Sequence, residues 1–260
     1  MKEKKVCLVT GGAKRIGRCI CTELARDGWD IAIHYNKSDH ESKTLEREIK
    51  KIGRKSIRIQ ADFNTFTEDY LFVNFVKYVE EKLGSINLLI NNAAVFNFDD
   101  PTSTSRNEME FHFSNNLIAP IMLTKALYET TKKNMRKTKT TAVINLLDQK
   151  LWNPNPDFFS YTLSKGALKE ATELMARTYA PNLRVLGIAP GITLPVENQK
   201  KIEFEAAHKK TPLNRSSTPK NIADAVVWLA KAEAITGTTL IIDGGQHLVP
   251  SQKDVVFMKS

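Results

Sequence analysis

Tyr161 and Lys165 are spaced so that they could take part in one proton transfer. Residues four apart share a face of an α-helix, so Tyr161 and Lys165 would meet if this segment is helical. A phenol has an ordinary pKa of about 10, and a nearby ammonium group lowers it. The pair therefore predicts a proton donor for a negative charge that develops on a reacting oxygen or nitrogen. Asp148 lies thirteen residues before Tyr161, at the end of an apolar run.

A glycine-rich turn, Thr10-Gly-Gly-Ala-Lys-Arg-Ile-Gly17, separates an apolar run from a helical segment. Small residues let the backbone approach a phosphate, and the helix that follows offers free N–H groups. After the next apolar run the chain reads His34-Tyr-Asn-Lys-Ser38, without the carboxylate that would bind a ribose 2′-hydroxyl. Arg15, Lys37 and Ser38 could instead hold a 2′-phosphate, so we predict NADP(H) rather than NAD(H).

Short apolar runs alternate with helical segments along the whole chain. We expect strands at 6–9, 30–35, 56–60, 86–90, 141–147, 183–188 and 238–242. We expect helices at 15–27, 41–52, 68–83, 109–134, 161–179 and 218–231. The helix at 109–134 would bend at Pro120, and Thr218 would cap the start of the last helix. This pattern indicates an α/β fold, with one doubly wound parallel sheet of about seven strands and helices on both faces. Residues 1–260 would form a single domain, in which the loop 193–212 is a substrate lid.

The composition argues against several other classes of protein. The net charge is 38 − 29 = +9, but the lysines are scattered and no basic run is interleaved with aromatic residues, so we predict no nucleic-acid partner. No apolar run approaches the roughly 20 residues of a membrane span. The five histidines lie far apart and predict no metal site. Three clustered cysteines, Cys7, Cys19 and Cys21, suggest reduced thiols in a cytoplasmic protein.

Taken together, the motifs resemble the short-chain dehydrogenase/reductase family over nearly the whole chain. Besides the turn and the Tyr161–Lys165 pair, Asn91-Asn-Ala-Ala94 is similar to the family's Asn-Asn-Ala-Gly, and Asp243-Gly-Gly245 closes the last strand. The resemblance implies a Rossmann-like fold, a homotetramer, and catalytic roles for Tyr161, Lys165, Asp148 and Asn116, with Asn116 holding a water in a proton relay. It implies cofactor binding by Gly11, Lys14, Arg15, Ile16, His34, Tyr35, Asn36, Lys37, Ser38, Asp62, Asn92, Ala93, Ala94, Lys165, Pro190, Gly191 and Thr193.

Within that family the chain is most similar to pteridine reductases. The similarity lies in Lys14-Arg15, in the 34–38 segment, and in Phe96, which the resemblance implies would stack on a pterin ring. Most family members have serine where this chain has Asp148. An ionised carboxylate cannot donate a hydrogen bond and would repel an oxyanion. Asp148 would therefore fit either if it is protonated in the cleft or if the substrate offers donors or a positive charge. A pterin offers N–H donors and an imine that becomes cationic, and pteridine reductases resemble this chain in having aspartate here.

We therefore predict an NADPH-dependent reductase that transfers hydride to a pterin-like heterocycle of the dihydropteridine or dihydrofolate class, with Phe96, Asp148 and Tyr161 at the substrate. One alternative is an NADP-dependent carbonyl reductase of the 3-oxoacyl type, although its marker, a serine at position 148, is missing. A second is a non-catalytic NADP-sensing regulator, although such proteins often lose the Tyr–Lys pair. Asp148 could also be a structural cap, with another residue orienting the substrate.

Overall fold

One parallel sheet organises the chain in this computed structural model, which describes residues 5–133, 141–195, 201–254 and 257. Its strands are β1 (Val6–Val9), β2 (Asp30–Tyr35), β3 (Ser56–Gln60), β4 (Leu88–Asn91), β5 (Thr141–Leu146), β6 (Leu183–Pro190) and β7 (Thr239–Ile242). They lie in the order β3-β2-β1-β4-β5-β6-β7, and each neighbouring pair is parallel. The predicted doubly wound, Rossmann-like sheet is confirmed, and its winding reverses between β1 and β4.

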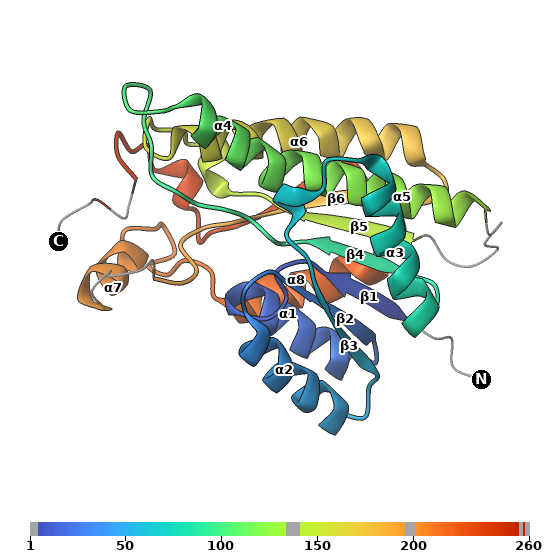
Figure 1. Cartoon of the computed structure of the whole chain (residues 1–260). Coiled ribbons are helices and arrows are strands. Elements are labelled where there is room, and N and C mark those ends of the chain that lie inside the picture. The colour runs from blue at the N-terminus through green and yellow to red at the C-terminus, as the bar shows by residue number, and fades with distance from the viewer. Residues whose placement is uncertain (1–4, 134–140, 196–200, 255–256, 258–260) are drawn as a thin grey trace.

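Helices cover both faces of the sheet (Figure 1). They are α1 (Arg15–Arg26), α2 (Asp39–Lys51), α3 (Asp69–Leu83), α4 (Arg106–Phe113), α5 (Ala119–Lys133), α6 (Phe159–Tyr179), α7 (Lys201–Lys209) and α8 (Pro219–Lys231). Helices α1, α2 and α8 lie on one face, and α3, α5 and α6 lie on the other. Short helical turns follow β3, α4, β5 and β7, namely η1 (Phe63–Thr65), η2 (Ser114–Ile118), η3 (Gln149–Leu151) and η4 (Gln246–Leu248).

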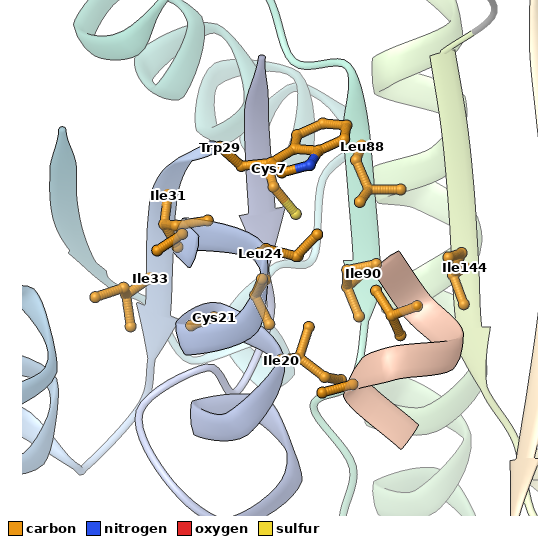
Figure 2. Packing of buried hydrophobic residues seen from close by; sticks show 14 of the residues in the cluster. Cys7, Ile20, Cys21, Leu24, Trp29, Ile31, Ile33, Leu88, Ile90 and Ile144 are labelled. Carbon is orange, nitrogen blue, oxygen red and sulfur yellow. The ribbon is translucent and has the colours of Figure 1, made fainter. Parts of the chain in front are cut away.

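The core has two halves because each central strand is apolar on both faces. In β1, Cys7 and Val9 belong to the cluster under α1 and α8, whereas Val6 and Leu8 belong to the cluster on the opposite face. Figure 2 shows Ile20 and Leu24 of α1 packed over side chains of β1, β2 and β4. Burying a side chain of this size stabilises the fold by roughly 1.5–3 kcal/mol. This packing fixes α1, and with it the glycine-rich turn, against the sheet.

The long helix expected at 109–134 is interrupted and begins earlier than predicted. It starts at Arg106 because the Ser105 hydroxyl caps it, accepting a bond of 3.2 Å from the Glu108 N–H. A π-helical turn, η2, then separates α4 from α5 directly before Pro120. Proline has no N–H, so the Asn116 carbonyl cannot receive its usual α-helical bond, and the predicted bend appears as this wider turn. The expected end at Asn134 lies outside the described residues.

The segment predicted as the loop 193–212 contains α7, so the assignment of loop structure was wrong there. Its sequence Lys201-Ile-Glu-Phe-Glu-Ala-Ala-His-Lys209 is rich in strong helix formers, which outweighed the irregular pattern around it. The start of α8 is confirmed: Thr218 and Asn221 form a capping box, and Pro219 is the first helical residue. Within the described ranges, no helix is long and apolar enough to cross a bilayer, and no group of three metal-binding side chains gathers.

Candidate active site

A cleft of about 510 Å³ opens at the carboxyl ends of the central strands, where the winding of the sheet reverses. This crevice is the usual ligand site in open α/β sheets. Sixteen of the predicted site residues line it, from segments far apart in the sequence. They are Gly11, Lys14, Arg15, Ile16, His34, Asn36, Asn92, Ala93, Ala94, Phe96, Asp148, Tyr161, Lys165, Pro190, Gly191 and Thr193.

The glycine-rich turn leaves the start of α1 open to an anion. Lys14, the residue before the helix, forms no capping bond with its side chain, and the first turn carries no acidic residue. The N–H groups there are therefore available to a phosphate, beside the cleft. Asn92 fastens the turn to β4, because its Nδ2 donates to the carbonyls of Thr10 at 2.9 Å and Gly11 at 3.1 Å. These free N–H groups fit the phosphates of a dinucleotide.

Replacing Gly17 with alanine is expected to weaken NADPH binding by more than about tenfold and to destabilise the fold by roughly 1–3 kcal/mol. An added Cβ would lie 2.3 Å from the Gly11 carbonyl oxygen and 2.6 Å from Asn92 Nδ2, so the turn itself must move. Calorimetric titration with NADPH and thermal unfolding measure the two effects. The matched control is Gly166→Ala, whose Cβ would meet its nearest neighbour at 3.9 Å. Equal NADPH affinity in both variants would contradict the phosphate-binding role of this turn.

His34 holds the turn in place as a neutral ring. Its Nδ1 accepts a bond of 3.1 Å from the Gly11 N–H, so the proton lies on Nε2, which faces the Ala61 carbonyl at 3.1 Å. Burial lowers the pKa of His34 to about 4. The ring also stacks on Phe63 with centroids 4.2 Å apart. His34 therefore links the turn to the end of β3 without contributing a charge.

Five of the predicted site residues do not line the cleft: Tyr35, Lys37, Ser38, Asp62 and Asn116. The buried Tyr35 donates to Asp39 at 2.9 Å, on the α2 side of the sheet. Lys37 and Ser38 lie at the start of α2, directly after Asn36, which does line the cleft. The Asp62 carboxylate accepts a bond of 3.0 Å from the Asn64 N–H and so caps η1. Their contacts with a cofactor stay predictions.

Tyr161 and Asp148, which both line the cleft, are joined by a direct hydrogen bond. The Tyr161 hydroxyl donates to Asp148 Oδ2 at 2.9 Å. Asp148 Oδ1 accepts from the Lys150 N–H at 2.8 Å, which caps η3. Burial raises the pKa of the Asp148 carboxyl, although these two hydrogen bonds oppose the shift. Asp148 is therefore a structural cap and a member of the site at once.

Lys165 is buried one helical turn beyond Tyr161. Its Nζ donates to the Leu146 carbonyl at 2.6 Å, and burial lowers its pKa to about 8. The structure does not show the net lowering of the Tyr161 pKa that the Tyr161–Lys165 spacing predicts. Burial raises the pKa of Tyr161 well above its usual value, and the Asp148 carboxylate raises it further. Tyr161 thus holds its proton firmly at neutral pH.

Asn116 lies in η2 and uses its side chain to fasten the neighbouring loop. Its Oδ1 accepts from the Val95 N–H at 2.8 Å, while its Nδ2 donates to the Val95 carbonyl at 3.0 Å and to Ser164 Oγ at 3.1 Å. The structure thus gives this side chain a positioning contact beside Phe96. The predicted water relay stays a prediction.

Aromatic rings form one wall of the cleft. Phe96 stacks on Phe158 with centroids 4.0 Å apart, and its ring meets that of Tyr161 edge-on at 4.6 Å. Phe96 remains 39% exposed, so a flat ring could still pack against it.

Several cleft residues were not predicted as site residues from the sequence, among them the polar side chains of Gln149, Lys150, Gln246 and Asp254. Asp99, also not predicted, orients the start of α6 from outside the cleft. Its Oδ1 accepts from the Ser160 N–H at 3.0 Å, and its Oδ2 accepts from the Ser160 hydroxyl. Asp99 therefore caps the helix turn that carries Tyr161, a contact across 61 residues for which the sequence holds no periodic signal.

A family model described as enoyl-(acyl carrier protein) reductase matches residues 11–247. The chain belongs to the short-chain dehydrogenase/reductase family. Its predicted class, an oxidoreductase of this family, is confirmed. Curated relatives in the family include pteridine reductase 1 of Leishmania tarentolae, 28% identical over 94% of this chain and 96% of that protein. Another is glucose 1-dehydrogenase 2 of Bacillus subtilis, 28% identical over 95% of this chain and 96% of that protein.

Solved structures of short-chain dehydrogenase/reductase proteins superpose closely on the chain. One is FolM alternative dihydrofolate reductase 1 from Brucella canis, complexed with NADP. It is 36% identical, covers 96% of each chain and has a TM-score of 0.88. The corresponding protein from Brucella suis, also in complex with NADP, is 35% identical over 96% of this chain and 98% of its own, with a TM-score of 0.85.

Proposed function

We propose that the protein is an NADPH-dependent reductase of pterin-like heterocycles, the dihydropteridine and dihydrofolate class. The observation that carries the proposal is the hydrogen bond between Tyr161 and Asp148, beside the exposed ring of Phe96. The likeness to FolM alternative dihydrofolate reductases and to a pteridine reductase supports it.

The cleft offers the groups that NADPH requires. The open start of α1 would take the diphosphate, and Arg15, which lines the cleft, would approach a 2′-phosphate with a guanidinium that matches it in shape and charge. When bound, NADPH supplies the hydrogen and two electrons that reduce a carbon–nitrogen double bond. Arg15 also donates to the Pro195 carbonyl at 3.1 Å, so it ties the predicted lid to the cofactor side of the cleft.

Tyr161 would deliver the proton that completes the reduction. Its raised pKa keeps the hydroxyl protonated, which suits a donor acting on a substrate atom that becomes basic during the reaction. The Asp148 carboxyl accepts from the same hydroxyl at 2.9 Å and so orients it in the cleft. The buried ammonium of Lys165 balances negative charge that forms on this pair.

Asp148 favours a heterocycle over a ketone. A carboxylate accepts hydrogen bonds and attracts positive charge, and a pterin offers amino and N–H groups together with an imine that can be protonated. A ketone offers only an acceptor, which a carboxylate repels unless it is protonated. The glucose dehydrogenase among the relatives keeps carbonyl chemistry as the second candidate, and one assay separates the two.

The purified protein is expected to oxidise NADPH when dihydrobiopterin or dihydrofolate is added, with a preference for NADPH over NADH of at least about tenfold in kcat/KM. The decrease in cofactor absorbance, followed with NADPH and then with NADH, measures the turnover and the cofactor preference. A 3-oxoacyl thioester serves as the comparison substrate. Turnover of the thioester without turnover of any pterin would establish the carbonyl reductase instead. A preference for NADH would contradict the role of Arg15.

A further inference from the structure

The C-terminal segment 249–254 lies against the substrate end of the cleft, although it is remote in sequence from the other site residues. Figure 1 shows this segment (red) beside the start of α6. Asn153 binds it twice, with Nδ2 donating to the Val249 carbonyl at 2.5 Å and Oδ1 accepting from the Ser251 N–H at 3.4 Å. Asp157 accepts from the Asp254 N–H at 2.7 Å. The segment is therefore fastened to the loop between Asp148 and Tyr161.

A buried ion pair forms the innermost of these contacts. Lys150 Nζ lies 2.9 Å from Asp254 Oδ2, with only 4% of the lysine side chain and 14% of the aspartate side chain exposed. The same Nζ donates to Asn155 Oδ1 at 2.5 Å and lies 5.6 Å from the centre of the Phe158 ring. Breaking such a pair from one side leaves an uncompensated buried charge, so each partner holds the other in place.

Asp254 lines the cleft together with Asp148, Lys150 and Tyr161. Burial is the main cause of the raised pKa of both Asp148 and Tyr161, and the charge of Asp254 adds to it, in agreement with its place in the same cleft. A carboxylate has about four acceptor positions on its two oxygens, so one that binds lysine can accept further N–H donors. Two carboxylates at one end of a cleft suit a ligand rich in N–H groups.

We propose that Asp254 binds the N–H groups of the substrate from the C-terminal segment, and that Lys150 is the positioning residue that holds Asp254 there. The class of ligand is an amino-substituted nitrogen heterocycle, and the inference rests on the proposed function for its choice of substrate. Asp254 thereby sets substrate affinity, whereas Tyr161 and Asp148 act on the reacting atoms.

The test is Asp254→Asn in the full chain. Because a hydrogen bond to a charged acceptor contributes strongly to binding, we expect KM for dihydrobiopterin to rise about tenfold while kcat and KM for NADPH change less than about threefold. Amide hydrogen exchange at 249–254 should become faster as the ion pair weakens. The matched control is Asp224→Asn, which removes an exposed carboxylate paired with Lys220 on α8 and should leave every value unchanged.

The double variant Lys150→Met with Asp254→Leu separates binding from folding, because replacing both charges by apolar groups leaves no buried charge unpaired. KM for the pterin should stay high in this variant, since the carboxylate is gone. A KM equal to that of the wild type in either variant, or unchanged exchange at 249–254 in Asp254→Asn, would overturn the inference. If the wild type turns over no pterin, the proposed function fails alone. Calorimetric binding of dihydrobiopterin to the wild type and to Asp254→Asn then tests the role of Asp254, and equal Kd values would overturn it.

Discussion

Replacing Tyr161 with phenylalanine is expected to lower kcat for the pterin by about 10³-fold while leaving the Kd for NADPH within about threefold. The change removes one hydroxyl from a buried ring, and that hydroxyl is the donor to Asp148 at 2.9 Å. The neighbouring rings of Phe96 and His112 still pack against phenylalanine, so the wall of the cleft is kept. Steady-state oxidation of NADPH gives kcat, and calorimetric titration gives the Kd.

The matched control is Tyr179→Phe, the same chemical change at the other end of α6. Tyr179 stacks on Tyr128 with centroids 4.3 Å apart and lies outside the cleft. Its loss should leave kcat unchanged. If Tyr161→Phe retained most of the turnover, the proton would have to reach the substrate from another group, and Asp148 is the carboxyl nearest to that position.

The fold could be predicted from the sequence because its signals are local and repeated. Strands that are apolar on both faces are typical of a covered parallel sheet, and the carboxyl ends of such strands meet at one edge. The structure brings Gly11, Asn92, Asp148 and Pro190 together along one cleft, and it was the family resemblance that implied their roles. The predicted ends of the helices and strands mostly agree with the structure within two residues. The largest difference is the start of α4, which the Ser105 cap sets and the apolar pattern does not reveal.

The electrostatics of the site could not be predicted in the same way. The spacing of Tyr161 and Lys165 correctly puts both on one helix face, yet their pKa values depend on burial and on Asp148, which is a tertiary property. Asn116 illustrates the same limit. Its place in the helix was clear from the sequence, but its contacts with Val95 and Ser164 arise only where η2 packs against the loop after β4 and against α6.

Ion pairs between residues far apart in the chain also could not be predicted from the sequence. Lys150 and Asp254 are 104 residues apart, and neither belongs to a motif or to a periodic pattern. Each reads in the sequence as an ordinary surface charge, because charged side chains are seldom fully buried. Only the packing of 249–254 on the loop after β5 brings the two together. A charge pair that is absent from every local pattern can therefore still line the cleft.

Replacing Asp148 with serine tests whether the carboxyl selects the substrate. Serine is also a good capping residue, so the N–H of Lys150 keeps an acceptor and η3 should persist. What disappears is the carboxyl that Tyr161 contacts. We expect kcat/KM for dihydrobiopterin to fall on the order of 10- to 100-fold, the effect of losing a strong charge-assisted bond, while turnover of a 3-oxoacyl thioester stays level or rises.

The ratio of the two kcat/KM values is the decisive measurement, because a general loss of stability lowers both together. Asp100→Ser is the matched control: Asp100 caps a turn by accepting from the Thr102 N–H at 2.7 Å, and it lies outside the cleft. In Asp100→Ser the ratio of kcat/KM for the pterin to kcat/KM for the thioester should equal that of the wild type. If Asp148→Ser keeps full pterin turnover, Asp148 acts only as the cap of η3. The hydrogen bond to Tyr161 would then give no reason to prefer a heterocycle over a ketone.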